Sequence, residues 1–186
     1  MRNCPQCARR LEVPVTRERL VPIGRVSMEI VEAAPLLALA RAQGVSECEA
    51  FDQLLGAGRL PLVDSLFSYN KVVAKGRRYI GDCLRGVPPP THVAVGTDNT
   101  APVDGDTALV AEVFRDVITQ RLAVTDGARL RFFLPSTAAN GNTLREAAVF
   151  GPQPGSTILS RVTYSDIVKN STIAVNYTWE IVFSEP

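Results

Sequence analysis

The stretch Thr-Ile-Ala-Val-Asn-Tyr-Thr-Trp-Glu-Ile-Val-Phe, residues 172–183, has the clearest pattern in this chain of 186 residues. Apolar and polar side chains alternate along it with a period of two. The apolar set is Ile173, Val175, Tyr177, Trp179, Ile181 and Phe183. Because successive side chains of a strand point to opposite faces, the pattern predicts a β-strand with one face on a core. It favours antiparallel pairing, in which the other face of the sheet stays solvated.

Further short strands are predicted before this one, each bounded by turn residues. Asp126-Gly127 is a favoured hairpin pair, and Asn140-Gly141-Asn142 is a second turn cluster. The longest predicted strand, 112–124, is expected to contain a bulge. The predicted strands are 91–95, 112–124, 128–134, 143–150 and 156–164. Their spacing predicts an antiparallel β-sandwich-like domain over residues 87–186.

Residues 27–86 are predicted to form a helical region. A first helix is expected over 27–43, and a second begins at a capping box with Ser46 as N-cap and Glu49 at position N3. A third helix is expected over 70–84, where apolar residues recur at helical spacing.

Pro88-Pro89-Pro90 ends the helical region, because proline cannot continue a helix. The apolar stretch 62–68 fits neither period clearly. The predicted fold class is therefore α+β, with an N-terminal helical region followed by an antiparallel β-sandwich-like domain.

The first 26 residues are predicted to be an extended basic arm with a Cys-x-x-Cys pair, Cys4 and Cys7. The pair resembles one knuckle of a zinc ribbon, and zinc favours four tetrahedral ligands. With the two remaining cysteines, the candidate metal site is Cys4, Cys7, Cys48 and Cys83. The alternative is that Cys48 and Cys83 are packed helix residues, because a free cysteine behaves as a small hydrophobe. No cofactor is expected otherwise.

Several function classes find no support in composition or motifs. The chain has 20 Lys and Arg against 19 Asp and Glu, so its net charge of +1 predicts neither nucleic acid nor an anionic membrane as partner. The single histidine, His92, has no nucleophile in a matching pattern, and no phosphate-binding loop is present. Glu146 is either a general base or a structural ion-pair partner of Arg115 or Arg161, and we favour the structural role. The protein is predicted not to be an enzyme.

Four blocks of sequence carry a resemblance. They are Thr-His-Val-Ala-Val-Gly at 91–96, Thr-Ala-Leu-Val-Ala-Glu-Val-Phe-Arg at 107–115, Asn-Thr-Leu-Arg-Glu-Ala-Ala-Val-Phe at 142–150 and Ile-Leu-Ser-Arg at 158–161. In order and spacing they resemble the N-terminal domain of bacteriophage tail-collar fibre proteins and of other small virion structural proteins. The resemblance spans roughly residues 70–183. Ala148 departs from it, because the family usually has glycine there.

The resemblance implies a non-enzymatic structural protein of a phage virion, made in the host cytoplasm. It would act as a tail, collar or baseplate adaptor that forms a symmetric homo-oligomer and attaches to neighbouring virion proteins. The family domain normally opens a long fibre, whereas this chain ends at Pro186. We therefore expect the attachment role and not a receptor-binding tip. Two alternatives remain open, a head-decoration protein of the same virion and a zinc-binding protein-interaction module.

Overall fold

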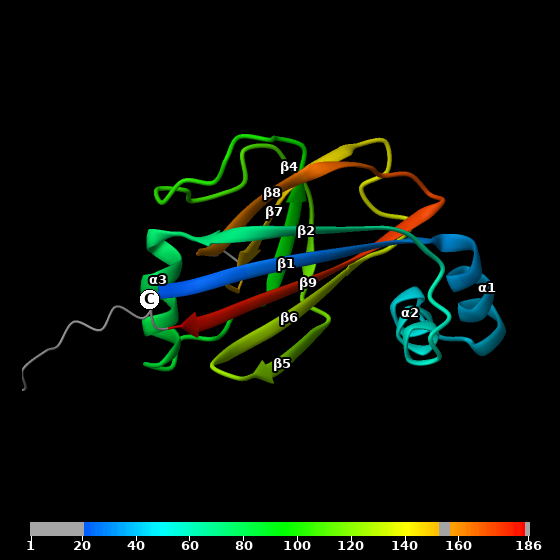
Figure 1. Ribbon diagram of the computed structural model, residues 1–186, viewed down its shortest axis with the longest axis horizontal. Coiled ribbons are helices and arrows are strands. Elements are labelled where there is room, and N and C mark those ends of the chain that lie inside the picture. The colour runs from blue at the N-terminus through cyan, green and yellow to red at the C-terminus, as the bar shows by residue number, and fades with distance from the viewer. Residues whose placement is uncertain (1–20, 153–156, 185–186) are drawn as a thin grey trace, which may run out of the picture.

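The computed structural model describes residues 21–152 and 157–184 of the chain. Within them the chain forms nine strands and three short helices (Figure 1). In chain order they are β1 (Val21–Glu32), α1 (Ala33–Gln43), α2 (Glu47–Gly56), β2 (Leu62–Val72), α3 (Ala74–Cys83), β3 (His92–Gly96), β4 (Glu112–Val117), β5 (Gln120–Val124), β6 (Gly127–Leu134), β7 (Thr143–Phe150), β8 (Ile158–Val168) and β9 (Ile173–Ser184).

The nine strands form one antiparallel sheet, in the order β4-β3-β7-β8-β2-β1-β9-β6-β5. The pattern at residues 172–183 is confirmed as β9, whose Val175, Tyr177 and Trp179 are fully buried or nearly so. Phe132 of β6 packs against Tyr177 at 5.8 Å between ring centroids. Because one side chain in two points inward, the sheet encloses its main core on a single face.

The predicted α+β class with an N-terminal helical region is wrong, because the fold is mostly β and two of the sheet's long strands, β1 and β2, extend into that region. β1 pairs with β9 along all of its 12 residues, and β2 pairs with the other side of β1. From Gly24 to Ile30 every second residue of β1 is buried, which is the pattern of a strand. The helix predicted over 27–43 begins only at Ala33, because residues 27–32 belong to β1. Strands from 27–86 and from 87–186 thus share one mostly β fold.

The sheet curls, and its two edge strands, β4 and β5, follow each other directly in the chain. β4 and β5 are separated only by Ile118 and Thr119. The Ile118 N–H donates to the Thr91 carbonyl at 2.8 Å, next to β3, and the Thr119 N–H donates to the Arg131 carbonyl at 2.9 Å, within β6. The segment 112–124, predicted as one strand with a bulge, therefore leaves one edge of the sheet and joins the other.

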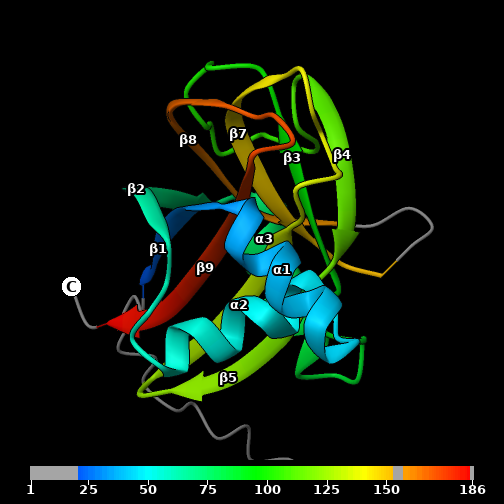
Figure 2. The ribbon, with the colours of Figure 1, turned by 90° about the vertical axis from the view of Figure 1, so that its right-hand side faces the viewer.

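The helices lie at opposite ends of the curled sheet (Figures 1 and 2). α1 and α2 cover the outer face of one end, where Phe51 packs on Phe133 at 5.5 Å between ring centroids. The capping box of α2 is confirmed, since the Glu49 N–H donates to Ser46 Oγ at 3.1 Å and the Ser46 N–H donates to Glu49 Oε2 at 2.8 Å.

The third helix, α3, is shorter at its start than predicted, because Asn70 still belongs to β2. Its residue Gly76 lies directly against β8, where a Cβ atom would come within 1.9 Å of the Leu159 carbonyl oxygen. A side chain at this position would push α3 off the sheet. None of the helices within the described residues is long and apolar enough to cross a membrane.

Candidate functional site

Two of the three most deeply buried charged side chains of the described residues form an ion pair between β7 and β8. Glu146 is 0% exposed and Arg161 is 1% exposed. Arg161 Nε donates to Glu146 Oε2 at 2.9 Å, and Arg161 also pairs with Asp106 at 3.1 Å. The backbone N–H groups of Val110 and Ala111 donate to the two Glu146 oxygens at 3.2 Å and 2.7 Å. Both carboxylate oxygens therefore have donors from the protein itself.

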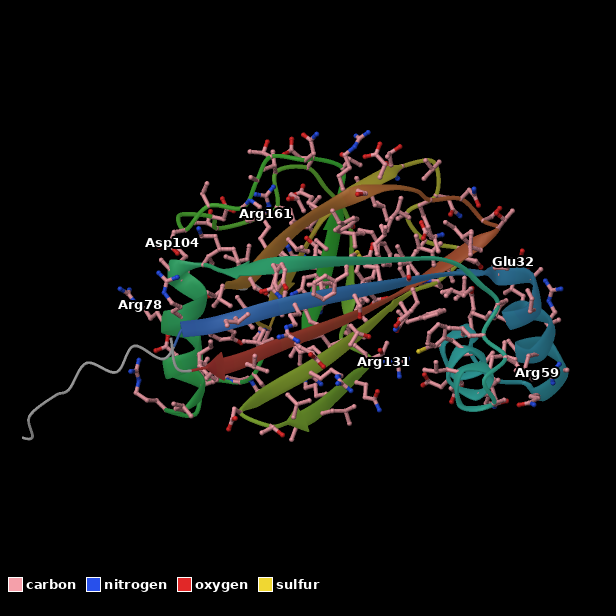
Figure 3. All side chains as sticks on the ribbon, in the orientation of Figure 1. Glu32, Arg59, Arg78, Asp104, Arg131 and Arg161 are labelled. Carbon is pink, nitrogen blue, oxygen red and sulfur yellow. The ribbon has the colours of Figure 1, made fainter. Side chains whose placement is uncertain are left out.

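This ion pair anchors the long loop 97–111, which joins β3 to β4 across the outer face of β7 and β8. Asp106 and the two amide donors belong to the loop, and Asp104 ties it to α3. Figure 3 shows Asp104 in this loop near α3. Arg77 donates to both oxygens of Asp104 at 2.7 Å and 2.9 Å, and these side-chain hydrogen bonds lower the Asp104 pKa. The loop is thus held by charges at two points.

The geometry supports the structural role predicted for Glu146. A general base needs a free lone pair aimed at a substrate proton, and the oxygens of Glu146 are already occupied. Its predicted pairing with Arg161 is confirmed. Arg115 pairs instead with Glu112 at 2.6 Å and lies 3.8 Å from the centre of the Phe150 ring.

Of the four candidate metal ligands the structure describes Cys48 and Cys83, and it holds these two far apart. Cys48 lies on α2 and Cys83 on α3, at opposite ends of the longest axis of the molecule (Figure 1). Burial raises the pKa of both thiols, which opposes formation of the thiolate that zinc needs. Cys4 and Cys7 lie outside the described residues, so their role as zinc ligands stays a prediction.

Other potential ligands are equally dispersed. His92 begins β3, and its Nδ1 lies 2.7 Å from Thr91 Oγ1. No three His, Cys, Asp or Glu side chains gather as a metal site among residues 21–152 and 157–184.

An apolar hollow of about 410 Å³ opens beside α3. Tyr79, Cys83 and Ile181 are among the residues that line it. The Tyr79 hydroxyl donates to the Pro88 carbonyl at 2.7 Å, and burial raises the Tyr79 pKa to about 12. The phenol therefore stays protonated and holds the proline-rich segment that follows α3.

A wider groove of about 480 Å³ lies on the outer face of β2, β1, β9, β6 and β5. Figure 1 shows these strands side by side, with α1 and α2 beyond one end and α3 at the other. In the middle of the groove Ser27 of β1 is flanked by Phe67 of β2 and Thr178 of β9, and Arg131 of β6 follows next. This face is polar at its centre and apolar toward β2.

Two of the three arginines that line the groove are in ion pairs. Arg131 donates to Asp52 of α2 at 2.6 Å, and Arg129 donates to Glu180 at 2.7 Å. Arg25, by contrast, is exposed and forms no ion pair with any residue that the structure describes. A cation is therefore left available beside the aromatic side chains of β2.

Those aromatic side chains are the least expected feature of this face. Phe67 is 58% exposed and Tyr69 is 67% exposed, and their rings meet edge to face at 5.1 Å between centroids. Exposed aromatic side chains beside arginine are typical of protein–protein interfaces. The arrangement can bind a protein surface.

Sequence reasoning missed this face because it left the stretch 62–68 unassigned. The signal was present in Phe67-Ser68-Tyr69-Asn70, which alternates between large apolar and small polar side chains. In a strand this pattern puts Phe67 and Tyr69 on one face.

Comparisons with known proteins place no further constraint on the site. No protein-family model matches the chain, and neither a curated protein nor a solved structure matches it. The resemblance to tail-collar fibre domains therefore rests on the four sequence blocks alone.

Proposed function

We propose that this chain is a non-enzymatic structural protein of a bacteriophage virion, which self-assembles and attaches to neighbouring virion proteins. In this role it is an adaptor of the tail, collar or baseplate. Its work is to present a rigid surface, so the binding energy comes from buried area and not from bond chemistry.

The observation that carries this proposal is where the four resembling blocks lie. They fall on β3, β4 with the end of the loop before it, β7 and β8. These strands are neighbours in the sheet, in the order β4-β3-β7-β8. Blocks separated by as many as 26 residues, 116–141, thus form one continuous half of the sheet, as expected if they specify a common scaffold.

The residues within those blocks have structural roles. Gly96 leaves no room for a side chain, because a Cβ atom would lie 2.5 Å from both the Ala111 carbonyl oxygen and Glu146 Oε1. Glu146 in turn holds Arg161. Blocks whose Gly96, Glu146 and Arg161 build the scaffold fit an assembly protein.

The groove supplies a surface for attachment. Phe67 and Tyr69 are more than half exposed, and the nearby Arg25 has no ion-pair partner among the described residues. We assign this patch, Arg25 with Phe67 and Tyr69, as the contact for another virion protein.

The direct test is quantitative mass spectrometry of purified particles of the phage that encodes this chain. We expect the protein at a fixed copy number, as a symmetric assembly requires. Its absence from the particles, or a trace amount that varies between preparations, would refute the proposal.

A variant test addresses the attachment patch. The double substitution F67S/Y69S should lower incorporation of the protein into particles at least tenfold, whereas L84S should not. Leu84 is the matched control, because it is 88% exposed but follows α3, away from the patch. Equal incorporation of both variants would exclude the patch as the contact.

A further inference from the structure

The strand β2 is only partly paired on one of its two sides. Toward β1 it is paired from Leu62 to Asn70, but toward β8 it is paired only through Lys71 and Val72. Beyond these two residues the Ser68 hydroxyl donates to the Thr163 carbonyl at 2.9 Å. A side-chain hydrogen bond therefore replaces the backbone hydrogen bond there. Among the residues that the structure describes, the edge from Leu62 to Phe67 has no partner strand on this side.

The backbone of this edge shows the lack of a partner directly. The N–H of Ser65 donates to Oδ1 of the adjacent Asp64 at 2.7 Å. A strand residue uses its neighbour's side chain in this way when no second strand offers a carbonyl. The edge therefore retains hydrogen-bonding capacity for an incoming strand.

The side chains of the edge are large and apolar. Leu62 is 53% exposed, Val63 is 56% exposed and Phe67 is 58% exposed. Natural proteins usually protect a free edge with lysine, proline or a bulge that turns it away. The stretch from 62 to 70 has no lysine, arginine or proline. Its only protections are the carboxylate of Asp64 and a shift of the β1–β2 register at Val63. From Ser65 to Phe67 the edge has neither.

We propose that the free edge of β2 pairs antiparallel with the same edge of a second copy of this chain, about a two-fold axis. The proposal rests on the proposed function, because it names the surface through which the protein self-assembles. A two-fold axis makes one patch serve both subunits, so a single exposed edge is sufficient.

The edge restricts the register of such a pair. Directly opposite residues must lie on the same face of the sheet, so the axis passes through a residue and its symmetry mate. An axis at Asp64 would place the Asp64 carboxylates of the two copies opposite each other. An axis at Leu66 would place Asp64 opposite Ser68 of the partner subunit, but Ser68 already bonds to β8. The axis at Ser65 avoids both problems.

In the register centred on Ser65, Val63 lies opposite Phe67 of the partner subunit, and Asp64 lies opposite Leu66 of the partner subunit. An aromatic side chain opposite a β-branched one is a favourable cross-strand pair. The Ser65 N–H then leaves the Asp64 carboxylate and donates to the carbonyl of Ser65 of the partner subunit.

This pairing also enlarges the attachment patch. The outer face of β5, β6, β9, β1 and β2 would continue directly into the same five strands of the second copy. The patch residues of both copies would then meet at the centre of one wide face. A partner virion protein would bind both copies together.

The first experiment measures the mass of the purified full chain by native mass spectrometry and by light scattering across a range of concentrations. We expect dimers or even-numbered assemblies for the natural chain and for V103K, and a halved mass for V63K. Val103 is the matched control, because it is a valine with the same exposure of 56% but lies in the loop 97–111. Circular dichroism verifies that each variant is folded.

A natural chain that is monomeric at every concentration, or an assembly that V63K leaves intact, overturns the proposal. In the first case the edge would be left for a strand of a different protein. Neither result affects the presence of the protein in purified particles, so failure of this inference is distinguishable from failure of the proposed function.

A second experiment tests the register. Under mild oxidation S65C should form a covalent dimer on a non-reducing gel, because Ser65 faces its symmetry mate at the axis. T107C, in the exposed part of the loop 97–111, should give no more dimer than the natural chain with its own four cysteines. Equal cross-linking of the two variants, or none in S65C, excludes this register.

Discussion

Arg161 of β8 and Glu146 of β7 form an ion pair that is shut off from solvent on every side, with Arg161 Nε 2.9 Å from Glu146 Oε2. The pair closes the loop 97–111 over the sheet. It also explains why a glutamate and an arginine occupy fully buried strand positions. The pair fixes the loop because Asp106 and the backbone N–H groups of Val110 and Ala111 reach these buried charges only when the loop is in place.

Substitution R161M should destabilise the fold strongly, because it leaves the Glu146 carboxylate buried without its cation. Removing one partner of a buried pair costs about 3–5 kcal/mol. Urea unfolding at 25 °C measures this loss. R145M is the control, since its partner Asp166 is exposed and solvent screens that pair. Similar urea midpoints for the two variants would show that the buried pair does not hold the loop.

Substitution G96A should also destabilise the protein, for a steric reason. The new Cβ atom would lie 2.5 Å from the Ala111 carbonyl oxygen, which belongs to the backbone and cannot move alone. Overpacking of this kind costs about 1–3 kcal/mol. Thermal unfolding should show a lower midpoint than for G105A, because nothing lies within 4 Å of a Cβ at Gly105. Matching midpoints would mean that the loop shifts without cost.

Because of Lys169, the free energy of unfolding should increase as the pH rises above 8. Its ammonium group is buried and donates to Asn140 Oδ1 at 2.9 Å and to the Asn170 carbonyl at 3.0 Å. Burial lowers the Lys169 pKa from 10.5 to about 8, and the charge of Glu47 opposes this shift.

The sign follows from proton binding. Between the folded pKa of about 8 and the unfolded value of 10.5 the unfolded chain binds more protons at Lys169 than the folded one. The free energy of unfolding therefore gains a positive slope with pH in this window. K169M, compared with the natural chain in urea titrations from pH 7 to pH 10.5, should have a flatter slope. An unchanged slope would contradict a lowered pKa.

The double variant F67S/Y69S should leave stability nearly unchanged while it impairs assembly. Both side chains are more than half exposed, so their removal creates no cavity in the core. The thermal midpoint should stay close to that of the natural chain, and incorporation into particles should fall. A large drop in the midpoint would show that the two aromatic side chains serve the fold of β2 and not a partner.

The sequence by itself determined the strands whose one face is apolar and the turns that separate them. β9 was predicted correctly because six large apolar side chains alternate along it, and α2 was predicted correctly because its capping box is a local interaction between Ser46 and Glu49. The structural role of Glu146 was also predictable, since a charge within an apolar strand needs a partner.

Only the tertiary structure decided the place of β1 and β2. Both strands gain their burial from neighbours that are distant in sequence, as β1 does from β9, and a local window contains no trace of that pairing. The same holds for the break at Ile118 and Thr119, where one chain segment passes between the two edges of the sheet. The unpaired edge from Leu62 to Phe67 is likewise a property of the assembled sheet. Whether a strand has one neighbour or two depends on how the sheet closes, and local sequence does not encode it.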